Sequence, residues 1–216
     1  PNAGSNVPAT PSAPSLCCGG SSASFSAAPE KVSKINQFLA RTTADSKVYI
    51  DQIGNSNVIT VQQTGTYQNY TNYFGNGSFN NVAVNQNGNG STQVNYVDLK
   101  LGTASSSSNS NSVVINQNST GGGKAVFANI TESNNTLNVL QKDNGSHWAD
   151  ITLSGGNKTL GITQQGSAGH MAKIELSGQP SSLNLTQSGS TQQFYSIQHN
   201  CATAGGCAAI SVTQGQ

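Results

Sequence analysis

Four cysteines have the most distinctive chemistry in this chain: Cys17, Cys18, Cys201 and Cys207. They form two close groups, with no Cys-x-x-Cys spacing and no histidine at a metal-ligand spacing, so we expect disulfides in an oxidising compartment. Four cysteines permit three pairings. One pairing closes each group on itself, although a bridge between adjacent cysteines is strained, and the other two tie the start of the chain to its end.

Two histidines could form a second chemical site. His147 and His170 begin segments that match at H-x-A-x-I-x-L-S-G, 23 residues apart. On adjacent turns of a repeating fold their rings would stack within about 5 Å, which is close enough to share a metal ion. Two histidines without a nearby carboxylate or cysteine are a poor ligand set, however. We therefore favour a hydrogen-bonding role at a corner, in the place of a repeated asparagine, over metal binding.

The carboxylates mark no catalytic site. They are scattered through different segments, so no pair is placed for general acid and base catalysis. We expect them to be solvated outward charges that moderate aggregation. The chain is accordingly predicted to be no enzyme and to hold no cofactor. The carboxylates concerned are Asp51, Asp98, Glu132, Asp143, Asp150 and Glu175.

Aromatic residues gather in one short stretch, at Tyr67, Tyr70, Tyr73 and Phe74. Such a cluster could form an adhesive or ligand-stacking patch. It could also pack over a widened turn of the fold, and aromatic packing is the interpretation that we favour.

The composition limits the surfaces that could hold these groups. The 216 residues include 9 Lys and Arg and 8 Asp and Glu, which is 8% charged residues and a net charge of +1. An ordinary soluble domain has about 25%. The chain therefore offers no basic surface for nucleic acid and too little charge for disorder by self-repulsion. No apolar run approaches the roughly 18 residues of a membrane span, and the chain opens without a signal-like segment, so we expect a mature secreted chain.

From residue 46 onward the sequence contains seven related segments, which start 23 to 31 residues apart. They are residues 57–63, 80–86, 111–117, 135–141, 158–164, 181–187 and 208–214. Within each segment alternate positions are apolar, which predicts a strand with one buried face. Each segment closes on a glutamine: Gln63, Gln86, Gln117, Gln141, Gln164, Gln187 and Gln214.

A second strand precedes each of these segments. The second strands are predicted at residues 46–52, 68–74, 93–99, 125–131, 147–155, 170–178 and 193–199. A repeat of about 23 residues with two short strands and no helix cannot bury its apolar face alone, so the repeats must stack. We therefore predict an all-β fold, a two-sheet β-solenoid of about seven strand-turn-strand repeats over residues 46–216. Seven turns at about 4.8 Å give a stack about 34 Å tall.

Residues 1–45 form a different region, an N-terminal arm of low complexity. Its first 28 residues are rich in Pro, Ala, Ser and Gly, which is typical of a flexible lead. Pro29 then suits the first turn of a helix, and Val32, Ile35 and Phe38 follow at helical spacing. The arm is predicted to end in a short amphipathic helix over residues 29–40.

The first repeat carries a more specific pattern, Ser46-x5-Gln52-x-Gly54-x2-Asn57-x-Ile59-x3-Gln63. It resembles the curlin repeat of bacterial curli fibres, Ser-x5-Gln-x-Gly-x2-Asn-x-Ala-x3-Gln, with Ile at the Ala position. The later repeats depart from it, because Leu153 and Leu176 replace a glutamine and Asp143 stands in a glycine position. The resemblance implies a subunit of a secreted functional amyloid, exported unfolded through a pore and nucleated at the bacterial cell surface into fibres for biofilm and adhesion.

Physical arguments lead to self-assembly as well. Stacked Asn and Gln amides hydrogen-bond to their copies above and below, and the two ends of the stack are unpaired edges. Open ends of matching shape polymerise head to tail into a filament, so the predicted partner is a second copy of the chain. We further hypothesise that the arm of one subunit lies along its neighbour and is fixed there by inter-subunit disulfides.

The alternative is a monomeric β-solenoid that binds something on a flat face, such as a surface adhesin, part of a phage fibre or an ice-binding protein. Ice binding would need a regular outward Thr-x-Thr array, and an adhesin would need capped ends. A carbohydrate-active enzyme of the β-helix type ranks third, because the acid cluster is missing and the core is too thin for a cleft.

Overall fold

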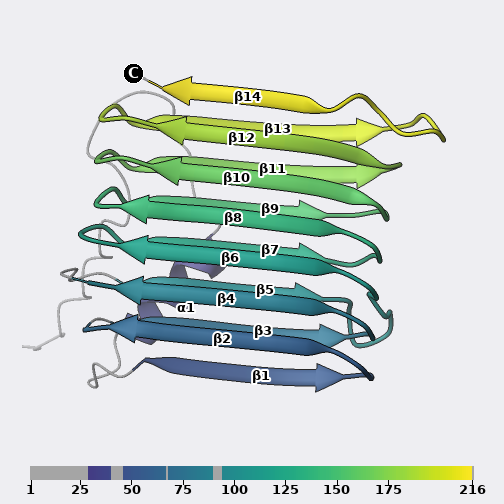
Figure 1. Cartoon of the computed structure of the whole chain (residues 1–216), viewed down its shortest axis with the longest axis horizontal. Coiled ribbons are helices and arrows are strands. Elements are labelled where there is room, and N and C mark those ends of the chain that lie inside the picture. The colour runs from purple at the N-terminus through teal and green to yellow at the C-terminus, as the bar shows by residue number, and fades with distance from the viewer. Residues whose placement is uncertain (1–28, 40–45, 67, 90–93, 216) are drawn as a thin grey trace, which may run out of the picture.

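The computed structural model describes residues 29–39, 46–66, 68–89 and 94–215, so the predictions for Cys17, Cys18, Tyr67 and the first 28 residues lie outside the described residues. Fourteen strands form two parallel sheets of seven (Figure 1). Sheet A contains β1 (Lys47–Ile53), β3 (Asn69–Asn76), β5 (Asn95–Leu101), β7 (Lys124–Ile130), β9 (His147–Leu153), β11 (His170–Gly178) and β13 (Gln193–Cys201). Sheet B contains β2 (Val58–Gly65), β4 (Asn81–Gly88), β6 (Ser112–Ser119), β8 (Thr136–Asp143), β10 (Lys158–Gln165), β12 (Ser181–Ser188) and β14 (Ile210–Gly215).

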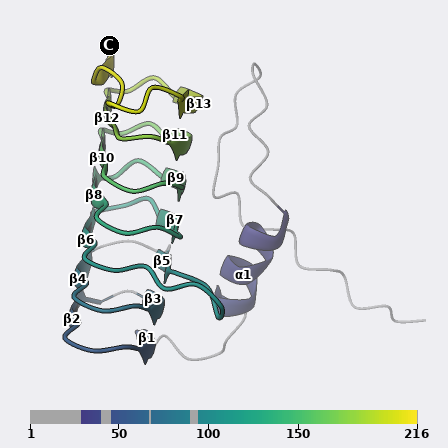
Figure 2. The same ribbon diagram turned by 90° about the vertical axis from the view of Figure 1, so that its right-hand side faces the viewer.

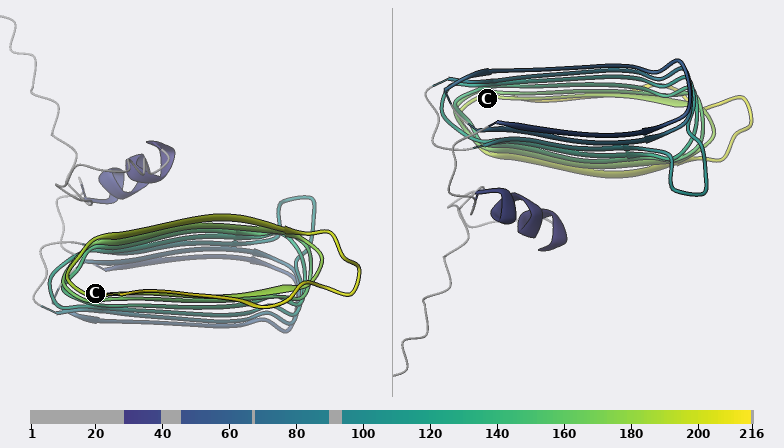
Figure 3. Two further views of the ribbon diagram at one scale, coloured as in Figure 1. Left: turned by 90° about the horizontal axis from the view of Figure 1, so that it is seen from above. Right: turned by 90° about the horizontal axis from the view of Figure 1, so that it is seen from below.

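Each odd-numbered strand and the even-numbered strand after it make one turn of the chain, here called a rung (Figure 3). Rung 1 is β1 with β2, and rung 7 is β13 with β14. Neighbouring rungs are in register, so that Val139, Ile162 and Leu185 occupy the same place on successive rungs of sheet B. We call such a set of equivalent residues a column. The predicted two-sheet β-solenoid of about seven repeats is confirmed.

The core is the thin layer between the two sheets. Alternate side chains of each strand point into it, and those of the inner rungs, such as Val84, Leu99 and Ile174, are fully buried. The inward residues of rungs 1 and 7 are only partly buried; among them are Ile59, Val61, Ile197, Ile210 and Val212. Burial therefore decreases from the middle of the stack to its two ends.

Repeated turns at the corners explain the Gly, Asn and Ser content. Ser56, Ser110 and Asn134 precede equivalent strands with φ angles of 55° to 61°, the left-handed region that Asn tolerates better than branched residues. Gly155 has a φ of 74°, and a Cβ there would lie 1.9 Å from the carbonyl oxygen of Gly178 one rung above. Stacked turns therefore require glycine where backbones meet most closely.

Two loops interrupt the regular repeat at the same edge of the solenoid (Figure 3). One joins β5 to β6 and contains a short bridge between Thr103 and Ser106, and the other joins β13 to β14 and contains Cys207. They account for the longest and the next longest repeat intervals in the sequence.

Helix α1 (Pro29–Leu39) lies on the outer face of sheet A (Figure 2). Its Val32 packs against a second apolar cluster that includes Tyr96, Phe127, Trp148 and Met171. The helix itself was predicted from the sequence, whereas this docking place was not. Within the described ranges, no helix has the length and apolar character of a membrane span.

Candidate functional site

A continuous ladder of glutamine side chains joins all seven rungs. Nε2 of Gln63 donates to Oε1 of Gln86 at 2.8 Å, and equivalent bonds of 2.8 to 3.0 Å follow up to Gln214. Every bond runs in the same direction, from one rung to the next along the sequence. The ladder is therefore polar: Gln63 Oε1 at one end can accept a further bond, and Gln214 Nε2 at the other can donate one. The remaining members are Gln117, Gln141, Gln164 and Gln187.

The same amides also tie sheet B to sheet A. Nε2 of Gln117 donates to the carbonyl oxygen of Tyr96 at 3.2 Å, and Nε2 of Gln187 donates to that of Met171 at 3.0 Å. Both amide hydrogens are therefore used, one within the rung and one between rungs. A buried amide with complete hydrogen bonding stabilises the stack instead of adding a desolvation cost.

A second ladder runs along a corner of the solenoid through asparagines. Oδ1 of Asn57 accepts from the backbone N–H of Asn80 at 2.9 Å, and Oδ1 of Asn80 accepts from that of Asn111 at 2.9 Å. Asn111 continues the ladder to Asn135 at 2.8 Å, and Asn135 accepts from the N–H of Lys158 at 2.9 Å. The corner asparagine of the repeat motif therefore holds the backbone of the next rung.

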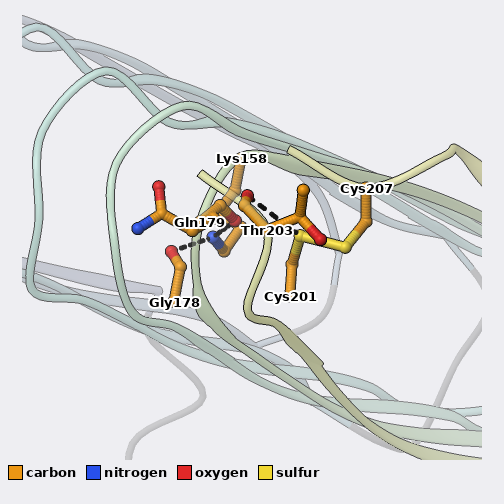
Figure 4. Close-up of a disulfide and its surroundings, with 6 residues drawn as sticks. All are labelled: Lys158, Gly178, Gln179, Cys201, Thr203 and Cys207. Atoms are coloured by element: carbon orange, nitrogen blue, oxygen red, sulfur yellow. Dashed lines mark hydrogen bonds between the residues drawn. A yellow bond between two sulfur atoms is a disulfide. The ribbon is translucent and has the colours of Figure 1, made fainter. Parts of the chain in front are cut away.

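Lys158 takes the asparagine place on rung 5 and is almost completely buried. Its ammonium donates to the carbonyl oxygens of Gly178 and Gln179 on the rung above (Figure 4). Burial lowers the pKa of Lys158. The repeat alignment already places this lysine at an inward corner, which is the sequence signal for its burial.

Lys124 is a second buried lysine, with no exposed surface. Its Nζ donates to the carbonyl oxygens of Gly122 at 3.0 Å, Asp143 at 2.9 Å and Gly145. Burial lowers the pKa of Lys124 to about 7, and the charge of Asp143 opposes this decrease. The sequence analysis missed this residue, because nothing marked the start of its strand as a corner position.

The two histidines lie in the same column as Lys124. The strand register places Asn69 and Asn95 of sheet A in this column, and the column begins at Ser46 on rung 1. Asn57 does not belong to it. The expectation that the histidines replace the corner asparagine of the motif was therefore wrong. They stand in the place of the motif serine, at the opposite corner of the rung.

The histidine rings stack with centroids 5.1 Å apart and planes 6° apart. Nε2 of His147 donates to the carbonyl oxygen of Lys142 at 2.9 Å, and His147 Nδ1 accepts from the N–H of His170 at 3.3 Å. Burial, followed by the charge of Lys124 and then by His170, lowers the pKa of His147 to about 3. Among the described residues, no three His, Cys, Asp or Glu side chains come together as a metal site would require.

Cys201 and Cys207 form a disulfide that closes the loop between β13 and β14 (Figure 4). Their Cα atoms lie 5.8 Å apart, and the backbone N–H of Cys207 bonds to the carbonyl oxygen of Pro180 at 3.0 Å on the rung below. The hypothesis of a bridge from the arm to these cysteines is corrected by this pairing, because the short loop brings each sulfur to its local partner.

Two carboxylates that we expected to be solvated are instead buried. Asp98 and Asp150 point outward from sheet A, but α1 covers them, and they are 4% and 5% exposed. Lys34 of α1 pairs with Asp98, and Lys31 pairs with Asp150. The expectation of solvated charge was wrong here because it treated the solenoid without its arm. These ion pairs hold the helix on the sheet.

The predicted aromatic cluster divides between two faces of β3. Tyr73 points inward, is buried, and donates from its hydroxyl to Oε1 of Gln52 at 2.7 Å. Tyr70 points outward and stacks on Tyr96 at a centroid distance of 4.8 Å. Phe74 also points outward, into a groove of about 660 Å³ that is bordered by Tyr49 and Lys100. Packing therefore accounts for Tyr70 and Tyr73, and a groove remains beside Phe74.

The other motif residues of rung 1 serve the turn. Oγ of Ser46 accepts from the backbone N–H of Asn69 at 3.1 Å, and Nε2 of Gln52 donates to the carbonyl oxygen of Ile53 at 2.7 Å. Gly54 has a φ of 111°. Above Gln52, its column becomes apolar, with Leu153 and Leu176 on rungs 5 and 6.

The two end rungs are open. No described element lies below β1 and β2 or above β13 and β14 (Figure 1). Val48 and Ile50 of β1 point into the core space, yet they are 41% and 50% exposed. At the other end, Nε2 of His199 is buried without a hydrogen-bond partner. Exposed apolar side chains therefore lie at the rung 1 end of the stack, and an unused hydrogen-bonding group lies at the rung 7 end.

These features define a β-solenoid with internal amide ladders and with end rungs that no described element covers. Comparison of the chain with protein-family models, with curated proteins and with solved structures found no match. The resemblance to the curlin repeat therefore rests on the spacing of residues 46–63 and its weaker copies.

Proposed function

We propose that the chain is the structural subunit of a secreted, curli-like amyloid fibre, in which β-solenoids stack end to end at the bacterial cell surface. The observation that carries this proposal is the complementarity of the two open ends. Gln214 Nε2 offers a donor where rung 7 ends, and Gln63 Oε1 offers an acceptor where rung 1 begins. Placing rung 1 of one copy on rung 7 of another would extend the ladder without a break.

The inward residues of the two end rungs also fit one another. Continuing the strand register would place Tyr195 beside Val48 of the next copy and Ile197 beside Ile50. These apolar pairs would remove the exposed surface of rung 1 from water, which is the main driving force of association. His199 would then lie beside Gln52, whose amide can supply the partner that His199 Nε2 lacks.

The proposed role is passive and mechanical: fibres that form matrix for biofilm, adhesion and surface colonisation. We propose no catalysis, no cofactor, no nucleic acid partner and no membrane insertion. An export pore and a surface nucleator are further partners that the curlin resemblance implies. The low charge supports stacking, because a charge repeated on every rung would repel itself whereas Asn, Gln, Ser and Thr form ladders.

One observation favours the alternative of a monomeric binding protein. The groove beside Phe74 combines exposed aromatic, acidic and basic side chains at Tyr49, Asp51 and Lys100, which would suit a small ligand. Such a protein would need no contact at its end rungs. The two candidates therefore differ in whether purified protein forms filaments.

Negative-stain electron microscopy of protein incubated at high concentration in an oxidising buffer tests the proposal. We expect unbranched filaments from the natural chain and none from Ile50→Lys, because a lysine there would be buried without a partner at each junction. The matched control is Tyr49→Lys, which is on the same strand and similarly exposed but points away from the core. A natural chain that stays monomeric, or an Ile50→Lys variant that polymerises as well as the control, contradicts end-to-end stacking.

A further inference from the structure

The outer face of sheet B is a broad surface with no described element on it, since α1 lies on the opposite side of the solenoid (Figure 2). Every outward residue of its strands is partly or fully exposed. Most are Thr, Asn, Gln or Ser, with Val58, Val114 and Leu140 as larger apolar members. The face is therefore a flat array of neutral groups that both donate and accept hydrogen bonds.

Charge is almost absent from this face. Among the outward residues of the seven described strands of sheet B, Lys142 is the one charged side chain. The outer face of sheet A carries seven: Lys47, Asp51, Asp98, Lys100, Asp150, Lys173 and Glu175. The centre of a protein interface is depleted in charged residues, because burying an unpaired charge is costly. Of the two outer faces, that of sheet B is the one suited to burial.

Two shallow grooves run between its side-chain columns. One of about 340 Å³ is bordered by Asn85 and Asn116, and one of about 140 Å³ is bordered by Asn138 and Thr163. Leu140 borders both. It belongs to rung 4, the middle of the seven, so an apolar side chain marks the centre of the face. A facing sheet could insert its own columns into such grooves, as in dry contacts between stacked sheets.

We propose that this face binds the same face of a second copy, so that two solenoid stacks pair laterally through sheet B. A face of seven rungs and about eight residues measures about 34 by 26 Å, or about 900 Å² per copy. A stable protein interface buries about 800 Å² per partner. A two-fold contact also brings like surfaces together, which neutral amides and hydroxyls tolerate because each can donate to the other.

A polysaccharide is the other occupant that a flat polar face suggests. Sugar rings stack on exposed aromatic side chains, and the described strands of sheet B contain none. The outward aromatic residues are on sheet A, among them Tyr49, Tyr70 and Phe194. The distribution therefore favours a second copy on sheet B. Lateral pairing goes beyond the end-to-end stacking proposed above and does not require it.

The test compares two double variants that each add two lysines two rungs apart in one column. Asn116→Lys with Thr163→Lys places them on either side of Leu140 on sheet B, and Thr152→Lys with Gln198→Lys places them on the outer face of sheet A. Mass per length is measured by dark-field scanning transmission electron microscopy. We expect two chains per about 34 Å of filament for the natural protein and the sheet A variant, and a twofold lower value for the sheet B variant.

Other results overturn the proposal. Natural filaments with the mass per length of one chain would exclude pairing through this face. A sheet B variant whose filaments keep the mass per length of two chains would exclude it as well. Natural filaments one chain wide that bind cellulose, with binding lost in the sheet B variant, would assign the face to a glycan. If no filaments form, analytical ultracentrifugation of the natural chain decides: a dimer that the sheet B variant abolishes supports pairing, and a monomer at high concentration contradicts it. Failure of stacking and failure of pairing are thereby separated.

Discussion

The inner rungs and the end rungs of this solenoid have the same construction but very different surroundings. Ile174 on rung 6 and Ile50 on rung 1 occupy one column of sheet A, yet the first is fully buried and the second is half exposed. The glutamine ladder shows the same contrast, because inner members have amide neighbours on both sides whereas Gln63 and Gln214 have one each.

This difference shows that a single rung cannot bury its own inward residues. An inward apolar residue stabilises a rung only when another rung covers it, since the hydrophobic contribution follows the area removed from water. The inward apolar residues of rungs 1 and 7 are therefore stabilised less than those of the inner rungs, and the proposed neighbouring copy would cover them. The interior forms a folded core, and the ends expose the surfaces that we propose for the end-to-end contact.

The largest expected effect compares Ile174→Ala with Ile50→Ala in the unassembled chain. Truncation at the buried Ile174 should lower the free energy of unfolding by about 2 to 5 kcal/mol, and truncation at Ile50 by about half as much or less, because Ile50 is already half exposed. Urea unfolding followed by circular dichroism measures both. Equal losses would show that the end rung is covered in solution and would remove the contrast.

Acid should act on the inner rungs through His147. The folded chain lowers the pKa of this histidine from 6.5 to about 3, so folding excludes a proton that the unfolded chain binds. Stability is then fully present above pH 6.5 and is lost as the pH falls toward 3, by about 1.4 kcal/mol per unit of pKa decrease. Unfolding curves recorded across this range should show the loss, and His147→Asn, which restores the residue found at Asn69 and Asn95, should show a flatter profile. If this variant is as sensitive to acid as the natural chain, a group other than His147 causes the loss of stability.

The smallest expected effect lies in the ladder. Gln141→Leu leaves Oε1 of Gln164 and Nε2 of Gln117 as neighbours of an apolar side chain, which should cost about 1 to 3 kcal/mol. Gln214→Leu at the open end should change the stability of the unassembled chain by less than that. Thermal unfolding of the two variants ranks them, and a Gln214→Leu loss as large as that of Gln141→Leu would contradict an open end.

Much of the solenoid could be predicted because the same sequence pattern occurs seven times. Alternating apolar positions in seven copies set both faces of each strand, and the glutamine that closes each copy sets the register. A one-residue slip of a single copy would have moved the inward residues of that strand from the core to the surface. Residues such as Gln117 and Val139 were therefore placed correctly without any knowledge of their neighbours.

Features that occur only once in the chain could not be predicted from a repeated pattern. The burial of Asp98 and Asp150 depends on Lys34 and Lys31, which reach them from a helix far away in sequence. The buried Lys124 depends on three carbonyl groups in neighbouring turns. Such pairings follow from tertiary placement, and no local pattern of residue types specifies them.

Cryo-electron microscopy of filaments tests the central claim most directly. End-to-end stacking predicts an uninterrupted column of rungs about 4.8 Å apart, in which β14 of one copy lies beside β2 of the next and Gln214 Nε2 donates to Gln63 Oε1 across the junction. Filaments in which copies meet only through other faces, with rungs 1 and 7 still open to solvent, would contradict the claim.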